Sequence, residues 1–261
     1  MALADDFDGF LIDLDGVVWL GREPVPGAVE TLAALLDAGK GIVFVTNNPD
    51  RHPAVYAERL RGIGVDVGPE RIVTAGMVVA RLAAEAAGPG GSAFVIGPAA
   101  LKEMVATAGA TLLDGEPARE ASVVVVAGHR GFDYDELLTA KLALDAGAAL
   151  LATSHDPTMP MPGGAWPGTG AVLAAVETAS GRSAEIAGKP ERHLFEMALG
   201  VIGAPGRVAM VGDRIASDID GGRAAGLATV LVLSGASTRE DAEAATPPPD
   251  HVLESLAGLL P

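Results

Sequence analysis

The sequence predicts an α/β protein built around a parallel sheet with helices on both faces. Near-continuous runs of Val, Ile and Leu, such as those at 41–45 and 229–233, alternate along the chain with helical patterns. Runs of this kind are typical of parallel strands that are buried on both faces. Three of the runs end in polar residues, and parallel sheets bind ligands at the carboxyl ends of their strands. The alternation also continues through the middle of the chain, which indicates a second, smaller α/β domain inserted into the first.

The outer parts of the chain are expected to form the larger domain. The apolar run at 10–14 predicts its first strand, and Pro26-Gly27 opens a helix that Gly39 ends. The remaining elements expected in this domain are strands at 41–45, 208–211 and 229–233, a helix at about 53–63, a helix that begins near Ser217, and a last helix after the turn at 247–249.

The middle of the chain is expected to form the inserted domain. Its predicted strands and helices lie at 93–96, 122–127, 133–146, 150–153 and 169–180. We therefore divide the chain into a discontinuous core, 1–77 with 185–261, and an inserted domain at 78–184.

Composition and charge limit the classes of partner. Hydrophobic residues make up 49% of the 261 residues, which is typical of a globular protein, and the formal net charge is −16. A chain this acidic repels nucleic acid and anionic lipid, so neither is expected as a partner. An anionic substrate would need a local positive site, from a metal ion, a lysine or a helix N-terminus. The chain has no cysteine, which excludes disulfides, thiol catalysis and Cys-based zinc sites.

Neither a signal peptide nor a membrane span is expected. The first ten residues, MALADDFDGF, lack a basic n-region and an apolar h-region. The uncharged stretch at 157–176 contains four prolines and several glycines, which favour a loop running into a helix over a transmembrane segment. A cytoplasmic protein is the resulting prediction.

Four short motifs contain the polar residues of interest. Each has an ordinary structural interpretation by itself, because Asp-Gly pairs form turns, Thr, Asn and Ser cap helices, and a lysine before a helix is usually solvated. The motifs are DLDG at 13–16, TNN at 46–48, GKP at 188–190 and GDRIASD at 212–218.

In this order, the four motifs resemble those of the haloacid dehalogenase (HAD) superfamily phosphatases. The longer matches, DLDGVVWLG, VTNN and PGTG followed by GKP, are similar to subfamily IIA, the NagD-like and 4-nitrophenylphosphatase-like enzymes. The resemblance covers almost the whole chain. It implies a HAD-like Rossmannoid core with an inserted α/β cap domain, and a phosphomonoesterase that works through an aspartyl-phosphate.

The resemblance implies a role for most of the motif residues. Asp13 matches the nucleophile, which as a carboxylate needs no base to activate it. Asp15 matches the general acid and base. Thr46 matches a hydroxyl that binds the transferring phosphoryl group, and Lys189 matches a lysine that pairs with the nucleophile and the phosphate. The residues implied to complete the phosphate site are Gly16, Asn47 and Asn48.

The resemblance also implies a Mg²⁺ site. Asp213 matches a carboxylate that holds the ion together with Asp13 and the main-chain carbonyl of Asp15. Asp218 is expected to orient the ion and its waters without binding it directly. Mg²⁺ prefers oxygen ligands and keeps several waters, which suits so small a set of ligands.

The resemblance further implies that the cap selects the leaving group of a small phosphate ester. Loops that contain His129 and His155 are the candidate specificity elements. Sugar or polyol phosphates, phosphoglycolate and nucleoside monophosphates are the candidate substrates. A monomer and a homodimer formed through the cap both remain open.

Three other functions compete with a phosphatase. A signalling phospho-acceptor of receiver type uses a similar set of residues, but it would have neither Asp15 nor an inserted cap. A non-catalytic binding protein on the same fold remains an alternative, although every expected catalytic residue is present. A dehalogenase is disfavoured, because that reaction needs neither Asp15 nor the Mg²⁺ ligands.

Overall fold

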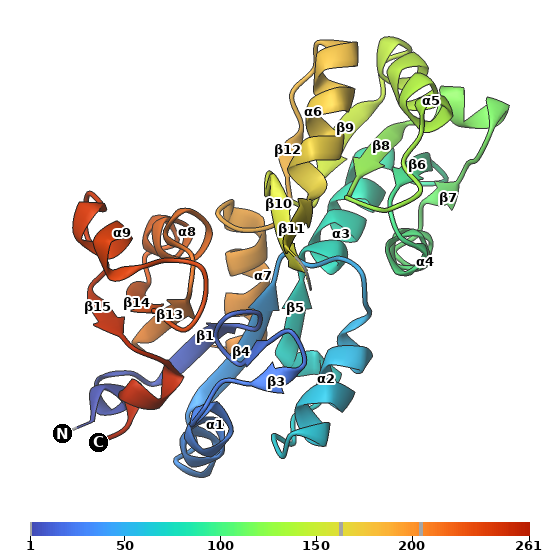
Figure 1. The fold of residues 1–261 in the computed structure, drawn as a ribbon. Helices are drawn as coiled ribbons and strands as arrows, with labels where there is room; N and C mark the ends of the chain where they lie inside the picture. The colour runs from blue at the N-terminus through green and yellow to red at the C-terminus, as the bar shows by residue number, and fades with distance from the viewer. Residues whose placement is uncertain (1, 162–163, 204–205) are drawn as a thin grey trace. The chain divides into compact units, whose positions relative to one another are not determined.

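The computed structural model describes residues 2–161, 164–203 and 206–261 (Figure 1). The chain forms two compact units. Unit 1 contains residues 1–46, 53–73 and 189–261, and unit 2 contains 47–52 and 74–188. These borders lie four residues from the expected ones at 77/78 and 184/185, and the short segment 47–52 groups with unit 2. The assignment of unit 1 as catalytic core and unit 2 as cap stays a prediction.

Unit 1 is built on a six-stranded sheet. Its strand order is β15-β14-β13-β1-β4-β5, and the neighbouring pairs from β15 through β4 are parallel. The strands are β1 (Gly9–Asp13), β4 (Gly41–Thr46), β5 (Ile72–Thr74), β13 (Val208–Gly212), β14 (Ala228–Val232) and β15 (His251–Leu253), and a small antiparallel hairpin joins β2 (Trp19–Leu20) to β3 (Glu23–Pro24).

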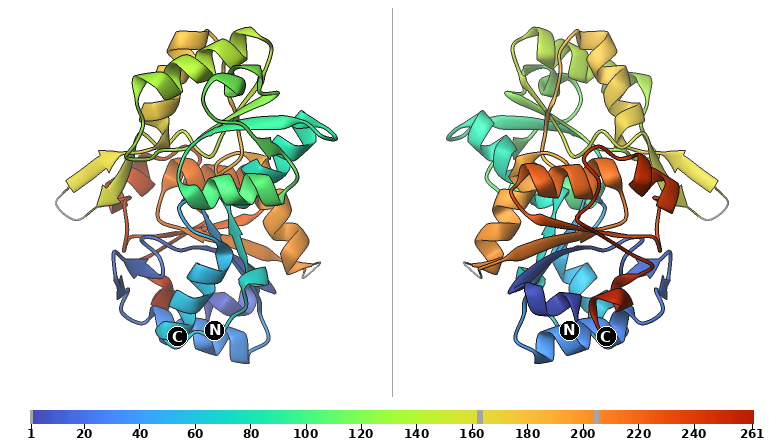
Figure 2. Two further views of the ribbon diagram at one scale, coloured as in Figure 1. Left: turned by 90° about the vertical axis from the view of Figure 1, so that its right-hand side faces the viewer. Right: turned by 90° about the vertical axis from the view of Figure 1, so that its left-hand side faces the viewer.

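Helices and helical turns connect the strands of unit 1. The α-helices are α1 (Ala28–Asp37), α2 (Pro53–Gly62), α7 (Arg192–Ile202), α8 (Asp220–Ala224) and α9 (Arg239–Ala244). A π-helical turn spans Ile215–Ile219, and 3-10 turns span Leu3–Asp6, Pro69–Arg71 and Leu256–Leu259. The two ends of the chain lie on the same side of this unit (Figure 2).

The central strands of unit 1 are buried along their whole length. Every residue of β1 and β13 is buried, so side chains on both faces of the sheet are covered. Phe10, Ile12 and Phe44 belong to one large apolar cluster on this sheet. Burial on both faces explains why these strands appear in the sequence as continuous apolar runs. The predicted α/β class is confirmed.

Unit 2 contains a five-stranded parallel sheet of order β12-β9-β8-β6-β7. The strands are β6 (Ser92–Ile96), β7 (Thr111–Leu112), β8 (Val123–Val126), β9 (Ala149–Ala152) and β12 (Glu185–Ile186). The helices are α3 (Ala75–Ala87), α4 (Ala99–Thr107), α5 (Tyr134–Asp145) and α6 (Thr169–Ser180), with a 3-10 turn at Glu116–Glu120.

The segment 157–176 was expected to be a loop that runs into a helix, and the loop part of this prediction is wrong. Two strands, β10 (Thr158–Met161) and β11 (Gly164–Pro167), pair antiparallel there, with Met159 opposite Trp166. The hairpin extends away from the sheet of unit 2 (Figure 2). Proline is tolerated in such a pair because each of the two strands has a free edge, where no N–H donor is needed. Helix α6 then begins at Thr169, as expected.

The helical segment expected to begin near Ser217 begins at Ile215, as a π-helical turn in which Ser217 is buried, and continues into α8. One further expectation fails near the C-terminus. The last helix expected after 247–249 is a short strand, β15, followed by a 3-10 turn. Pairing with β14 supplies the hydrogen bonds that make this three-residue segment a strand. Among the described residues, no helix is long and apolar enough to cross a membrane.

Candidate active site

Three of the sequence motifs meet at the carboxyl edge of the sheet in unit 1. Asp13 ends β1, Thr46 ends β4, and Asp213 directly follows β13. These strands are neighbours, because β1 pairs with β4 on one side and with β13 on the other. From β1 the sheet continues to β4 on one side and to β13 on the other, so β1 lies at a topological switch point. In α/β sheets, the chain connections on the two sides of such a point leave a crevice where ligands bind.

Lys189 connects two of the carboxylates. Its Nζ atom donates to Asp13 Oδ1 and to Asp218 Oδ1, each at 2.6 Å. All three side chains are buried: Lys189 is 3% exposed, Asp13 7% and Asp218 0%. The second oxygen of Asp218 accepts the backbone N–H of Arg214 at 3.0 Å, which fixes the turn that follows Asp213.

Burial and the attraction between Lys189 and the carboxylates have opposite effects on the pKa values of these groups. Burial raises the pKa of Asp13 well above its usual value, and Asp218 and Asp213 add to the rise, although Lys189 opposes it. Burial by itself would lower the pKa of Lys189, but the attraction of Asp13 and Asp218 outweighs it and the pKa is raised. Lys189 is therefore a permanent positive charge in a buried site.

The chain approaches the carboxylate of Asp213 very closely. The backbone N–H of Ala236 donates to its Oδ2 atom at 2.7 Å. A Cβ atom placed on Gly16 would lie 2.3 Å from the same oxygen, and one on Gly235 would lie 2.0 Å from it. Gly16 also has a φ of +87°, which side chains rarely allow. Both glycines are therefore required to leave room for Asp213.

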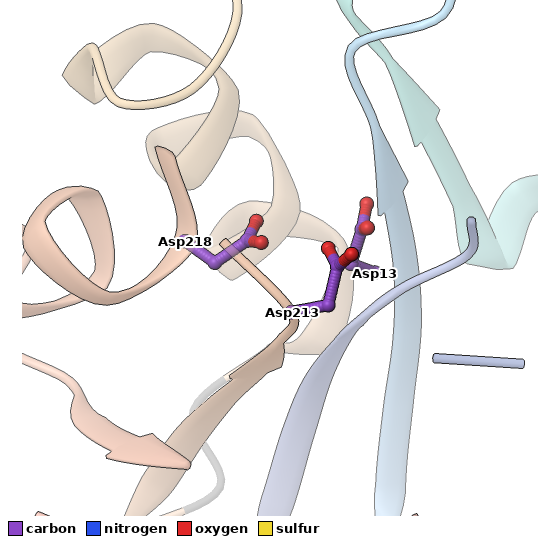
Figure 3. A group of neighbouring side chains, drawn as sticks. All are labelled: Asp13, Asp213 and Asp218. Atoms are coloured by element: carbon purple, nitrogen blue, oxygen red, sulfur yellow. The ribbon is translucent and has the colours of Figure 1, made fainter. Parts of the chain in front are cut away.

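Three carboxylates in this site fit a divalent cation. Asp13, Asp213 and Asp218 each offer one oxygen, and these oxygens lie within 4.8 Å of one another (Figure 3). Within the described part of the chain, Asp213 Oδ1 is the one buried side-chain oxygen or nitrogen that has no hydrogen-bond partner. A buried carboxylate oxygen without a partner is costly unless a cation binds it. Three carboxylates beside one ammonium also leave an excess of two negative charges, which a divalent ion would neutralise.

Protons and a divalent cation should compete for Asp213. Burial, and next the charge of Asp218, raise the pKa of Asp213 to about 6 in the metal-free site. Because its pKa is raised by folding, Asp213 binds a proton more tightly in the folded protein than in the unfolded chain. The stability that this gives the metal-free protein is full below the unfolded pKa of Asp213 and is lost as the pH rises through about 6. Mg²⁺ binds only the ionised form. We therefore expect the rise in Tm that Mg²⁺ causes to be small at about pH 5 and to reach its full size above about pH 7.

This expectation is tested by thermal unfolding in Mg²⁺ and in EDTA across that pH range. Asp213→Asn is the matched control, because it keeps the size of the side chain but cannot ionise, and it should show little effect of Mg²⁺ at any pH. An equal Mg²⁺ effect at about pH 5 and about pH 7.5 would contradict the competition.

Asp15 lies on the turn that follows β1. Its Oδ1 atom accepts the indole N–H of Trp19 at 2.8 Å, and its side chain is half-buried. The structure therefore places Asp15 two residues after Asp13 but outside the network that Lys189 forms.

The other candidate residues belong to unit 2. Asn47 donates through Nδ2 to Asp156 at 3.2 Å, and the side-chain oxygen of Asn48 accepts the backbone N–H of Asp50 at 2.9 Å. The Nε2 atom of His129 lies 2.8 Å from Oε2 of Glu136. His155 is exposed. The ring nitrogen Nδ1 of His129 accepts the N–H of Gly131, so in a neutral ring Nε2 carries the hydrogen and donates it to Glu136.

Sequence reasoning missed three residues that contact the candidates: Trp19 beside Asp15, and Gly235 and Ala236 around Asp213. Asp156 lies in the expected specificity loop of His155, but its contact with Asn47 was not expected. A signal was available for one pair, because Ser234-Gly235-Ala236 follows soon after a predicted strand, where the other motifs also occur. Nothing in the spacing of the sequence indicated the contacts of Trp19 or Asp156.

Two family models match the chain. A model for haloacid dehalogenase-like hydrolases matches residues 10–111, and a HAD-hydrolase-like model matches residues 186–259. Together the two matches include all four motifs.

Whole-length relatives agree with these matches. The chain is 36% identical to glycerol-3-phosphate phosphatase from Gallus gallus over all of this chain and 93% of the relative. A glycerol phosphate phosphatase from Mycobacterium tuberculosis, solved in complex with magnesium, is 35% identical with a TM-score of 0.92, over all of this chain and 78% of that one. NagD from E. coli K-12 is 31% identical with a TM-score of 0.85, over 96% of this chain and 97% of that one. The chain belongs to the haloacid dehalogenase-like hydrolases, within the subfamily IIA group of NagD-like and 4-nitrophenylphosphatase-like enzymes.

Proposed function

We propose that this protein is a Mg²⁺-dependent phosphomonoesterase that hydrolyses a small phosphorylated metabolite through an aspartyl-phosphate. The observation that carries the proposal is the buried network in which Lys189 joins Asp13 to Asp218, with Asp213 beside them. This network places a carboxylate, an ammonium and a candidate cation site at one sheet edge. Such an arrangement lets an acidic protein bind an anion locally.

The chain's own residues account for both chemical steps. An oxygen of Asp13 attacks phosphorus while the bond from phosphorus to the leaving oxygen breaks, and Asp15 gives its proton to that oxygen. Asp15 then takes a proton from the water that attacks the aspartyl-phosphate, so that phosphate leaves and Asp13 is regenerated. Lys189 and Thr46 hold the negative oxygens of the transferring phosphoryl group.

Asp13, Asp213 and the main-chain carbonyl of Asp15 would hold Mg²⁺, with Asp218 supporting them. When bound, the ion supplies positive charge to the phosphoryl oxygens and offsets the charge of the carboxylates. The free oxygen of Asp213 and the excess negative charge of the site support this assignment. The magnesium in the structure of the mycobacterial relative also supports it.

Polyol phosphates are the substrates we favour. Two of the relatives are named for glycerol phosphate. We place the choice of leaving group in unit 2, at the loops of His129 and His155 and the neighbouring segment 47–52. Sugar phosphates, phosphoglycolate and nucleoside monophosphates remain in the tested set.

The test is phosphate release from these four classes of ester and from 4-nitrophenyl phosphate, with Mg²⁺ and with EDTA. We expect the fastest release from a polyol phosphate, and its loss in EDTA. Equal rates in Mg²⁺ and EDTA would contradict the proposed metal dependence. No release from any of the esters would contradict the proposed function and favour a binding protein.

Replacing Asp15 with Asn tests general acid–base catalysis. Asparagine keeps the shape of the side chain but cannot exchange a proton with substrate, so turnover of a polyol phosphate should fall by about 10²- to 10⁴-fold. Steady-state phosphate release measures the loss. Glu23→Gln, an exposed change on the nearby strand β3, is the control and should keep the wild-type rate. An unchanged rate in Asp15→Asn would remove Asp15 from acid–base catalysis.

A further inference from the structure

We infer that Trp19 is a positioning residue for the general acid and base of this enzyme, an inference that rests on the proposed function. The indole N–H of Trp19 donates to Asp15 Oδ1 at 2.8 Å. This hydrogen bond holds one oxygen of Asp15 in place and leaves the other for the substrate. Trp19 itself does not contact the reacting atoms in this account.

The backbone between the two residues is folded so that the side chains meet. Asp15 and Trp19 form an isolated β-bridge, and the N–H of Gly16 donates to the carbonyl of Trp19 at 2.8 Å. The N–H groups of Val18 and Trp19 both donate to the carbonyl of Leu14. The turn after β1 therefore places the indole directly beside the carboxylate.

The ring of Trp19 is held on its other side as well. It is 1% exposed and belongs to the large apolar cluster of unit 1. The guanidinium of Arg59, on α2, lies 3.7 Å from the ring centroid and donates to the carbonyl of Gly21. Contact between a guanidinium and an indole face is favourable, so the ring has little freedom to rotate away from Asp15. A rigid donor of this kind can fix the orientation of a carboxylate.

The chemistry of the indole decides what this contact does. An indole N–H can only donate a hydrogen bond, so the atom that faces it must be an acceptor. If Oδ1 of Asp15 carried its proton toward the indole, two donors would face each other. Oδ1 of Asp15 must therefore act as an acceptor toward Trp19 throughout the reaction. The proton that Asp15 exchanges with the leaving group is carried by Oδ2, the oxygen that Trp19 does not hold. Trp19 thus selects both the orientation of the carboxyl group and the oxygen that works.

A purely structural role for Trp19 predicts a different result from a positioning role. Loss of packing around a buried indole would affect every substrate alike. Loss of orientation at Asp15 would harm esters in proportion to their need for a proton, since alkoxides are poor leaving groups and 4-nitrophenolate is a good one. The value of kcat/KM depends on the steps up to and including the first irreversible step, which is the departure of the leaving group. It therefore measures the step in which Asp15 acts as the acid.

The experiment compares Trp19→Phe with wild type on glycerol 3-phosphate and on 4-nitrophenyl phosphate. We expect kcat/KM for the glycerol ester to fall by about tenfold or more, and that for the nitrophenyl ester by less than about threefold, since only part of the general-acid contribution is lost. KM for the glycerol ester should change little, because Trp19 does not bind the phosphate. An equal loss on the two esters would overturn the positioning role.

Two further measurements cover the case in which Trp19→Phe folds poorly. In the first, a benzothienyl analogue of tryptophan replaces residue 19, so that the ring shape stays and only the N–H is lost. The same selective loss on the glycerol ester is expected, and wild-type behaviour on both esters would overturn the inference.

The second measurement combines Trp19→Phe with Asp15→Asn. If Trp19 acts through Asp15, the double variant should be no slower on the glycerol ester than Asp15→Asn alone. Additive losses would overturn the inference while leaving the proposed function intact. A wild-type protein that releases phosphate from none of the esters tested above would instead overturn the proposed function.

Discussion

Replacing Asp13 with Asn is expected to reduce phosphate release from the best substrate by about 1,000-fold or more. An amide cannot form the bond to phosphorus, and loss of a nucleophile removes the covalent route entirely. The fold should survive, because Asn has almost the same volume and Lys189 keeps its hydrogen bond to Asp218. Steady-state phosphate release with saturating Mg²⁺ measures the effect, and thermal unfolding confirms that the variant is folded.

Asp37→Asn is the matched control for this variant. It makes the same chemical change at an exposed position near the end of α1, in the same unit, and should keep the wild-type rate. Activity of Asp13→Asn within tenfold of wild type would show that Asp13 is not the nucleophile.

Replacing Lys189 with Met is expected to lower the free energy of unfolding of the metal-free protein by about 3–5 kcal/mol. The change leaves the carboxylates of Asp13 and Asp218 buried without their shared cation, and one unpaired buried charge already carries a cost of this size. Urea unfolding in EDTA measures the loss. Mg²⁺ should restore part of the stability, since it supplies positive charge to the same carboxylates.

Two variants separate this effect from a general loss of packing. Combining Lys189→Met with Asp218→Asn removes one of the unpaired charges and should recover part of the lost stability. Lys102→Met, at a partly exposed lysine that lies 3.8 Å from Asp114, should cost less than about 1 kcal/mol. A loss of less than about 1 kcal/mol in Lys189→Met would contradict the importance of the buried network.

The sequence was most informative where burial alone decides structure. The strands predicted at 41–45 and 208–211 are β4 and β13 within one residue at each end, because fully buried parallel strands need continuous apolar runs. The prediction failed where pairing decides structure. β15 is only three residues long and exists because β14 offers it hydrogen bonds. The β10–β11 hairpin has prolines and glycines in a pattern that also suits a loop.

The candidate site shows the same division. The sequence predicted that Asp13, Thr46 and Asp213 lie at the carboxyl ends of strands, which share one edge of a parallel sheet. That the three strands are neighbours is a finding of the structure. The hydrogen bonds of Lys189 to Asp13 and Asp218 join residues that are 176 and 29 positions apart, and spacing along the sequence does not encode such contacts. The contact of Trp19 with Asp15 depends on a single turn of irregular backbone after β1.

The most direct test of the account is to look for a phosphoryl group on Asp13. Asp15→Asn is mixed with 4-nitrophenyl phosphate and Mg²⁺, quenched in acid, and analysed by mass spectrometry of its peptides. This ester needs little help from an acid to form the aspartyl-phosphate, whereas water still needs the base that the variant lacks. We predict that the peptide containing Asp13 gains the mass of one phosphoryl group, located on Asp13. Release of nitrophenolate by the variant with no phosphoryl group on Asp13 would contradict the account.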